Sequence, residues 1–291
     1  MTAPSAADVI AIDRSQFGVA LGRQPMTFTH SVADHALLGL DAIAELADSW
    51  PERWVEHHLA DLPLLLPLGD PPGRLDVDAG EIVRGLDHNM CWMVLWFVET
   101  VRSYEALLDE CLDRVVDVVH QRDGAMGRRG ANIFLGSAGA VAPAHFDRHH
   151  NLLLQICGTK DVTVGQFEDL SVAQREIESH FGRNHNLHEL PENATTYHLE
   201  PGDGLYIPPY AFHWVKGGTD PSVSLSCGFR SPTSERAEKI HTCNIRLRRM
   251  GLSPSPPGRS ELVDRAKAAV VQGRRRLAPL GAKTVARLSG R

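Results

Sequence analysis

The sequence predicts a mainly β fold, a barrel or sandwich, with helices before and after it along the chain. Residues 131–232 are a succession of short apolar, β-branched or alternating segments separated by Gly, Pro, Asn and Asp. Residues 99–120 and 233–250 show a helical pattern instead, with apolar side chains at i, i+3, i+4 spacing in the first. In 291 residues we therefore expect one large domain with helical additions rather than two independent domains.

Each expected element follows from a local pattern of apolar residues and turn residues. Before the β-rich segment, the pattern predicts strands at 25–30, 54–59 and 62–68 and helices at 41–47, 78–84 and 99–120. Within it, the pattern predicts strands at 131–135, 144–147, 152–156, 161–165, 195–199, 204–207, 213–216 and 223–229. Further helices are expected at 171–181, inside a long insert, and at 233–250 and 261–271. The chain thus divides into an N-terminal α/β elaboration (1–125), a barrel core (126–232), and C-terminal helices with a basic tail (233–291).

Composition excludes several classes of protein. The longest apolar run, residues 93–98, is far shorter than the roughly 20 residues that span a bilayer, and residues 1–8 lack the features of a signal peptide, so neither membrane insertion nor secretion is expected. The five cysteines form no C-x-x-C pair, which predicts a reducing, cytoplasmic location and no zinc–thiolate site.

Charge is spread unevenly along the chain. The net charge of −6 gives no reason to expect nucleic-acid binding. Residues 259–291 nevertheless hold nine basic and two acidic side chains. We expect a solvated basic terminus there, and an anionic partner is the alternative interpretation.

A pair of polar residues in the β-rich segment is a candidate for metal binding. His145 and Asp147 stand two residues apart where a strand is expected. Because alternate side chains of a strand point the same way, both face one side and offer an imidazole and a carboxylate together. An exposed polar pair at a strand end is the competing interpretation. His149 and His150 follow at once, and we expect them on the surface or at the mouth of a pocket.

A third ligand is expected from a distant segment. The run PGDGLYIPPYAFHW, residues 201–214, contains a Gly-Asp turn, an apolar strand and a Pro-Pro stop, and then brings His213 onto the next strand. Two histidines and a carboxylate form the facial triad of non-haem Fe(II) oxygenases, which leaves three positions open for a co-substrate and O₂. Lys160 starts a neighbouring strand and can reach into the barrel to pair with a carboxylate; a surface lysine after a hairpin turn is the alternative.

Taken together, these residues resemble the JmjC/cupin-like 2-oxoglutarate oxygenases, and most closely the branch of the asparaginyl hydroxylase that acts on hypoxia-inducible factor. The resemblance rests on two strings, HFDRHHNLLLQICGTK at 145–160 and GDGLYIPPYAFH at 202–213. It covers about residues 131–230 well and the N-terminal third only loosely. It implies a double-stranded β-helix, the jelly-roll barrel of the cupins, and an oxygenase domain over residues 1–232.

The resemblance also implies a role for each matching residue. His145, Asp147 and His213 would hold Fe(II). Lys160 would bind the distal carboxylate of 2-oxoglutarate, and Asn151 would hydrogen-bond this co-substrate in the same pocket.

The sequence departs from the family pattern at two positions. The threonine that the family carries three residues before the first histidine is Ala142 here, and its asparagine fifteen residues after the distal histidine is Gly228. The polar residues of the last strand are candidates to compensate: Ser224, Ser226 and Arg230. Arg230 is an alternative to Lys160 for the carboxylate, because a guanidinium matches carboxylate geometry.

The implied activity is hydroxylation of a C–H bond with decarboxylation of 2-oxoglutarate to succinate. The substrate would be a peptide or protein side chain, an amino-acid-like molecule or another small molecule, with no nucleic acid or membrane as partner. The C-terminal helices would join two copies into a homodimer or cover an open end of the barrel. A non-catalytic metal-binding cupin that acts as a sensor or interaction module is one alternative, and a cupin enzyme that does not use 2-oxoglutarate is another.

Overall fold

The computed structural model describes residues 9–66, 73–181 and 186–273, so residues 274–291 of the expected basic tail lie outside the described part. Its contacts divide the chain into two units. The first comprises Met1–Glu168 and Asn186–Pro232, and the second comprises Asp169–His185 and Thr233–Arg291. The insert around residue 175, which the sequence places within the barrel segment, therefore packs with the C-terminal helices.

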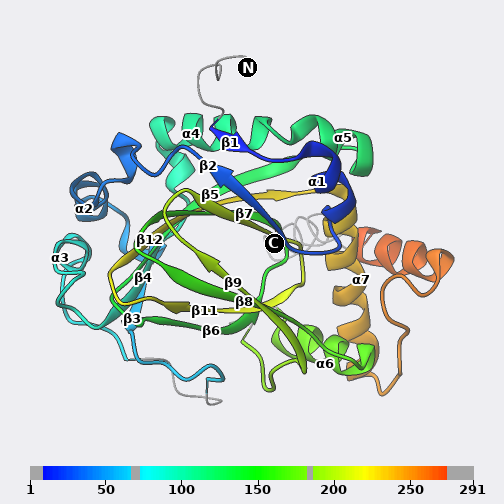
Figure 1. Ribbon diagram of the computed structural model, residues 1–291. Coiled ribbons are helices and arrows are strands. Elements are labelled where there is room, and N and C mark those ends of the chain that lie inside the picture. The colour runs from blue at the N-terminus through cyan, green and yellow to red at the C-terminus, as the bar shows by residue number, and fades with distance from the viewer. Residues whose placement is uncertain (1–8, 67–72, 182–185, 274–291) are drawn as a thin grey trace, which may run out of the picture. The chain divides into compact units, whose positions relative to one another are not determined.

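Two antiparallel sheets form the first unit (Figure 1). The larger sheet has the strand order β1-β2-β10-β7-β12-β5-β4-β3, and the smaller has the order β6-β11-β8-β9. The strands are β1 (Ile10–Ala11), β2 (Met26–His30), β3 (Val55–Leu59), β4 (Cys91–Leu95), β5 (Gly127–Gly136), β6 (Val141–Phe146), β7 (His150–Cys157), β8 (Lys160–Gln166), β9 (Asn193–Leu199), β10 (Asp203–Ile207), β11 (Phe212–Gly217) and β12 (Ser222–Arg230). Strands distant in sequence pair with one another, as β7 does with β12, which is the order of a jelly roll. The prediction of a mainly β jelly-roll fold is confirmed.

The helices flank this β segment in the sequence as expected. Those of the first unit are α1 (Arg14–Ala20), α2 (Leu40–Asp48), α3 (Ala79–Arg84), α4 (Arg102–Asp113) and α5 (Val116–Asp123). The later helices are α6 (Leu170–His180), α7 (Pro232–Arg249) and one at 261–273. The single helix expected at 99–120 is wrong in detail, because the chain breaks between α4 and α5, where Val115 adopts φ −118°.

The surroundings of strand β7 explain why its sequence is a continuous apolar run. Leu152 and Leu154 face the large core that helix α4 covers, whereas Leu153 faces the interior of the barrel. Both faces of the strand are therefore buried, and the alternation that marks a half-exposed strand disappears. The inner cluster also holds Val162 and Leu205 from neighbouring strands.

The strand expected at 62–68 is wrong for residues 62–66, which form no strand, and residues 67–68 lie outside the described part. The segment runs beside strand β6 instead: the Ala144 amide donates to the Leu64 carbonyl (2.8 Å), and the Val141 amide donates to the Ala60 carbonyl (3.0 Å). Pro63 has no N–H to donate, so this apolar stretch cannot continue a regular ladder.

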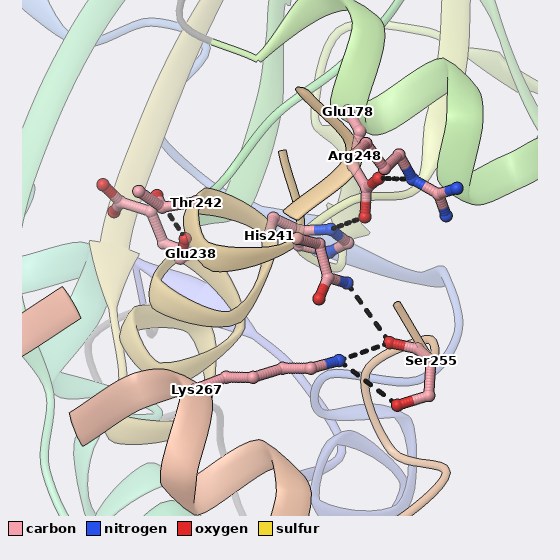
Figure 2. A network of polar contacts seen from close by, with 8 residues as sticks. Glu178, Glu238, His241, Thr242, Arg248, Ser255 and Lys267 are labelled. Atoms are coloured by element: carbon pink, nitrogen blue, oxygen red, sulfur yellow. Dashed lines mark hydrogen bonds and ion pairs between the residues drawn. The ribbon is translucent and has the colours of Figure 1, made fainter. Parts of the chain in front are cut away.

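The second unit contains a buried polar network (Figure 2). Glu178 of α6, whose side chain is 3% exposed, forms an ion pair with Arg248 of α7, and its carboxylate lies 3.8 Å from His241 Nδ1. Lys267 donates to the carbonyl oxygen (2.6 Å) and the hydroxyl (3.2 Å) of Ser255. Burial raises the pKa of Glu178, but hydrogen bonds from its partners outweigh this and leave the pKa below its ordinary value.

The helices of the described residues are all too short or too polar to cross a bilayer.

Candidate active site

Three side chains from two adjacent strands of the smaller sheet meet at one end of the barrel. His145 lies on β6, Asp147 follows the strand directly, and His213 lies on β11 as the register partner of His145. The ring centroids of the two histidines are 4.2 Å apart, and His213 Nε2 is 3.8 Å from Asp147 Oδ2. One ligand atom from each residue lies within 4.8 Å of the others. The structure thus brings together the three residues that the sequence singled out.

The loop between β10 and β11 fixes this arrangement. Tyr210 adopts a left-handed conformation, with φ 63°, which is uncommon for a residue other than glycine. In this conformation its amide donates to the carbonyl oxygen of Asp147 at 2.6 Å. The turn that delivers His213 is therefore tied to the backbone that carries the carboxylate.

The two histidines present the nitrogen that a metal needs. His145 Nδ1 lies 2.7 Å from the Pro143 carbonyl, and His213 Nδ1 lies 2.9 Å from the Ala211 carbonyl. Because a carbonyl can only accept, each Nδ1 carries a proton, and each Nε2 is the nitrogen available to a metal. Hydrogen bonds of this kind orient histidine ligands in metal sites.

Burial keeps one of these rings neutral. His213 is 3% exposed, and burial, reinforced by the neighbouring His145, lowers its pKa to about 4. A neutral imidazole is the form that binds a metal. Two imidazoles and one carboxylate therefore fit Fe(II), the metal of the facial triad.

Lys160 lines a pocket whose walls do not include the triad residues. This lysine is 8% exposed, so the interpretation as a surface lysine is wrong, and burial lowers its pKa to about 8. Its pocket is also lined by Trp92, Ser137, Ala142, Val215 and Ser222. Trp92 and Ser137 were not expected there, since only the pairing of β4 with β5 brings them to it.

The pocket and the triad lie at different levels of the same inner face. Lys160 pairs with Gly217, and Val164, four residues further along β8, pairs with His213. At 3.3 Å per residue the two levels are about 13 Å apart. A lysine side chain together with an extended five-carbon dicarboxylate can fill this span.

The other candidate residues lie on the two strands opposite. The Ser226 hydroxyl donates to Asn151 Oδ1 (2.9 Å), and the Ser224 hydroxyl donates to Gln155 Oε1 (2.6 Å). Both serines thus orient amides of β7. Because its oxygen faces Ser226, the Asn151 amide directs its NH₂ group away from β12.

Arg230 lies far from Lys160. Ser222, at one end of β12, lines the lysine pocket, whereas Arg230 ends the strand about 25 Å away. Arg230 acts electrostatically on His149, which neighbours the triad. The structure therefore places Arg230 at the triad end of the barrel.

The two histidines that follow Asp147 differ from each other. His150 is 1% exposed, so the expectation of a surface or pocket-mouth position is wrong for it. Its nitrogens contact the Tyr206 hydroxyl (2.8 Å) and the Ser231 hydroxyl (2.9 Å), and its ring stacks on Phe229. Burial lowers its pKa to about 3. His149 is half-buried.

Comparison with known proteins agrees with this geometry. Residues 109–237 match the JmjC domain family. JmjC oxygenases use Fe(II) and 2-oxoglutarate, and the triad of this chain is the ligand set that such an iron requires.

Relatives and solved structures are similar to this chain at low identity. Jumonji C domain-containing protein 5 of Drosophila melanogaster is 31% identical over 104 residues, which are 32% of this chain and 26% of that protein. The lysine-specific demethylase JMJ30 of Arabidopsis thaliana is 31% identical over 112 residues, 34% of this chain and 25% of that protein. The chain thus matches about a quarter of the length of these curated relatives. The X-ray structure of YcfD from Escherichia coli covers 90% of this chain and 67% of its own, with 16% identity and a TM-score of 0.51, which indicates a shared fold.

Proposed function

We propose that the chain is an Fe(II)- and 2-oxoglutarate-dependent dioxygenase that hydroxylates a C–H bond of a peptide or protein side chain, or of an amino-acid-like molecule. The observation that carries the proposal is the convergence of His145, Asp147 and His213 within 4.8 Å, in a segment that matches the JmjC domain family. Bound there, Fe(II) with 2-oxoglutarate and O₂ supplies the oxidising chemistry, while 2-oxoglutarate is converted to succinate and CO₂.

The residues of the chain bind and orient these reactants. His145, Asp147 and His213 hold the metal and leave three positions open. Lys160 binds the distal carboxylate of 2-oxoglutarate, and burial strengthens this ion pair. Asn151, oriented by Ser226, donates its NH₂ group to the co-substrate.

The buried apolar residues around the barrel interior exclude water from this site. Leu153, Val162 and Val164 belong to a buried cluster there, which lowers the local polarity and protects the oxidant from side reactions. The five free thiols support a reducing, cytoplasmic compartment, in which Fe(II) also persists.

Anaerobic titration with Fe(II) and 2-oxoglutarate tests the proposal. We expect the weak visible metal-to-ligand charge-transfer band of a chelated 2-oxo acid, and slow succinate formation on admitting O₂. His145→Ala should abolish both, whereas His198→Ala, which alters an exposed histidine of β9, should leave both unchanged. A fully metallated protein without the band would instead be a metal-binding cupin that does not use 2-oxoglutarate.

A further inference from the structure

A further histidine, which is not one of the three proposed metal ligands, lies beside them and packs against strand β12 of the larger sheet. His149 is half-buried and immediately precedes β7. A Cβ atom added at Gly228 of β12 would lie 2.9 Å from His149 Cδ2 and 3.3 Å from its Nε2. The imidazole therefore packs directly on the bare backbone of Gly228, a position that only glycine leaves open.

The same glycine lies opposite a polar residue of the site. Gly228 is the register partner of Asn151, whose amide is oriented by Ser226. Cross-strand partners point to the same face of a sheet, so Asn151 and the space above Gly228 lie side by side. His149 fills that space, which puts its ring next to the Asn151 amide.

The ring is also within electrostatic reach of the triad. Asp147 and His145 act on His149, and His149 in turn acts on His213. Burial lowers the pKa of His149, so the ring lies inside the protein beside the triad. Neutral or protonated, the imidazole carries at least one N–H donor.

We propose that His149, seated on Gly228, binds the metal-proximal end of 2-oxoglutarate next to Asn151. The inference rests on the proposed function and deepens it. Lys160 starts at a level about 13 Å from that of His213 and takes the distal carboxylate. His149 lies at the triad, where the 2-oxo acid end is held, and donates a hydrogen bond to its carboxylate.

Gly228 contributes to this binding arrangement because its lack of a side chain leaves room for the His149 ring. Its third-nearest neighbour is the Gly130 carbonyl at 3.5 Å, an ordinary contact, so His149 is the group that a side chain there would displace. Substitution of Gly228 therefore moves the imidazole without removing it. This gives a second, independent variant that perturbs the same contact.

Calorimetry of 2-oxoglutarate binding to the anaerobic Fe(II) protein tests the proposal, with Mn(II) affinity and the charge-transfer band as further readouts. We expect His149→Leu to weaken 2-oxoglutarate binding about tenfold to a hundredfold, the effect of one hydrogen bond to a charged group. His149→Gln, which keeps a donor, should restore part of the affinity. Mn(II) affinity should stay unchanged, because His149 is not a ligand.

A double-mutant cycle tests whether the effect of His149 on 2-oxoglutarate affinity depends on its contact with Gly228. Gly228→Ala should also weaken binding, and the double variant Gly228→Ala/His149→Leu should be no weaker than His149→Leu alone. Gly130→Ala is the matched control, since its Cβ would meet Glu99 Oε1 at an ordinary 3.5 Å and leaves His149 in place.

The outcomes separate the inference from the function on which it rests. Wild-type 2-oxoglutarate affinity in His149→Leu, or full additivity in the cycle, would overturn the role of His149. A loss of Mn(II) affinity as large as that of His145→Ala would overturn it too, because His149 would then be needed for the metal. If the wild-type protein binds Fe(II) but not 2-oxoglutarate, the proposed function fails first.

Discussion

Burial of a charged lysine lowers the stability of the folded protein. Lys160 has this effect because its ammonium group lies in a buried pocket. Burial lowers its pKa to about 8, so below pH 8 the folded protein holds a charge that the unfolded chain would solvate. Between this value and the ordinary 10.5 the unfolded state binds more protons, and stability rises with pH. We expect Lys160→Met to stabilise the protein by about 1–3 kcal/mol at pH 7 and to remove this rise, as measured by urea unfolding at several pH values.

Lys160→Met should also weaken 2-oxoglutarate binding. The variant is therefore expected to be more stable and less active than the wild type. Lys216→Met is the control, because Lys216 is exposed on β11. Destabilisation by Lys160→Met at neutral pH would show that the ammonium group has a partner in the free protein, contrary to the expectation.

At the scale of elements, helices α6 and α7 are joined by one buried carboxylate. Glu178 has a lowered pKa, so its contribution to stability is present above its ordinary pKa of 4.5 and is lost as the pH falls through the folded value. Glu178→Gln leaves Arg248 without its ion-pair partner and should cost about 3 kcal/mol at pH 7. Urea unfolding, followed by circular dichroism, measures this loss.

The difference between wild type and Glu178→Gln should shrink as the pH falls below 4.5, because the unfolded chain then binds a proton more readily than the folded carboxylate does. Glu110→Gln, on the exposed side of α4, should change stability little at any pH. A difference that is constant between pH 7 and pH 3 would contradict the ionic origin of the effect.

For the molecule as a whole, the second unit exposes apolar side chains that predict self-association. Met250, Leu252, Leu262 and Val270 are 55–80% exposed. We propose that this unit pairs two copies, because a second copy can bury large apolar side chains that one copy leaves exposed. Light scattering should give a dimer at micromolar concentration. Leu262→Glu should shift it to monomer, while Val19→Glu, at an exposed valine of the first unit, should not. A monomeric wild type contradicts the proposal.

The sequence alone located the strands and the three residues of the proposed triad. The period-2 pattern and the turn residues located every strand between 131 and 232, because each depends on local geometry. The two-residue spacing of His145 and Asp147 also fixes their common face locally. The failures lie where a local signal has two solutions, as at residues 62–66, whose apolar pattern fits both a strand and an edge segment beside β6.

Only the tertiary structure decided which polar residues share a space. His149 and His150 are neighbours in sequence, yet one borders the triad and the other is buried against Phe229. Arg230 and Lys160 both suit a carboxylate, but the strand register puts them at opposite ends of the barrel. Contacts of this kind depend on pairing between distant strands, and single-chain periodicity does not encode that register.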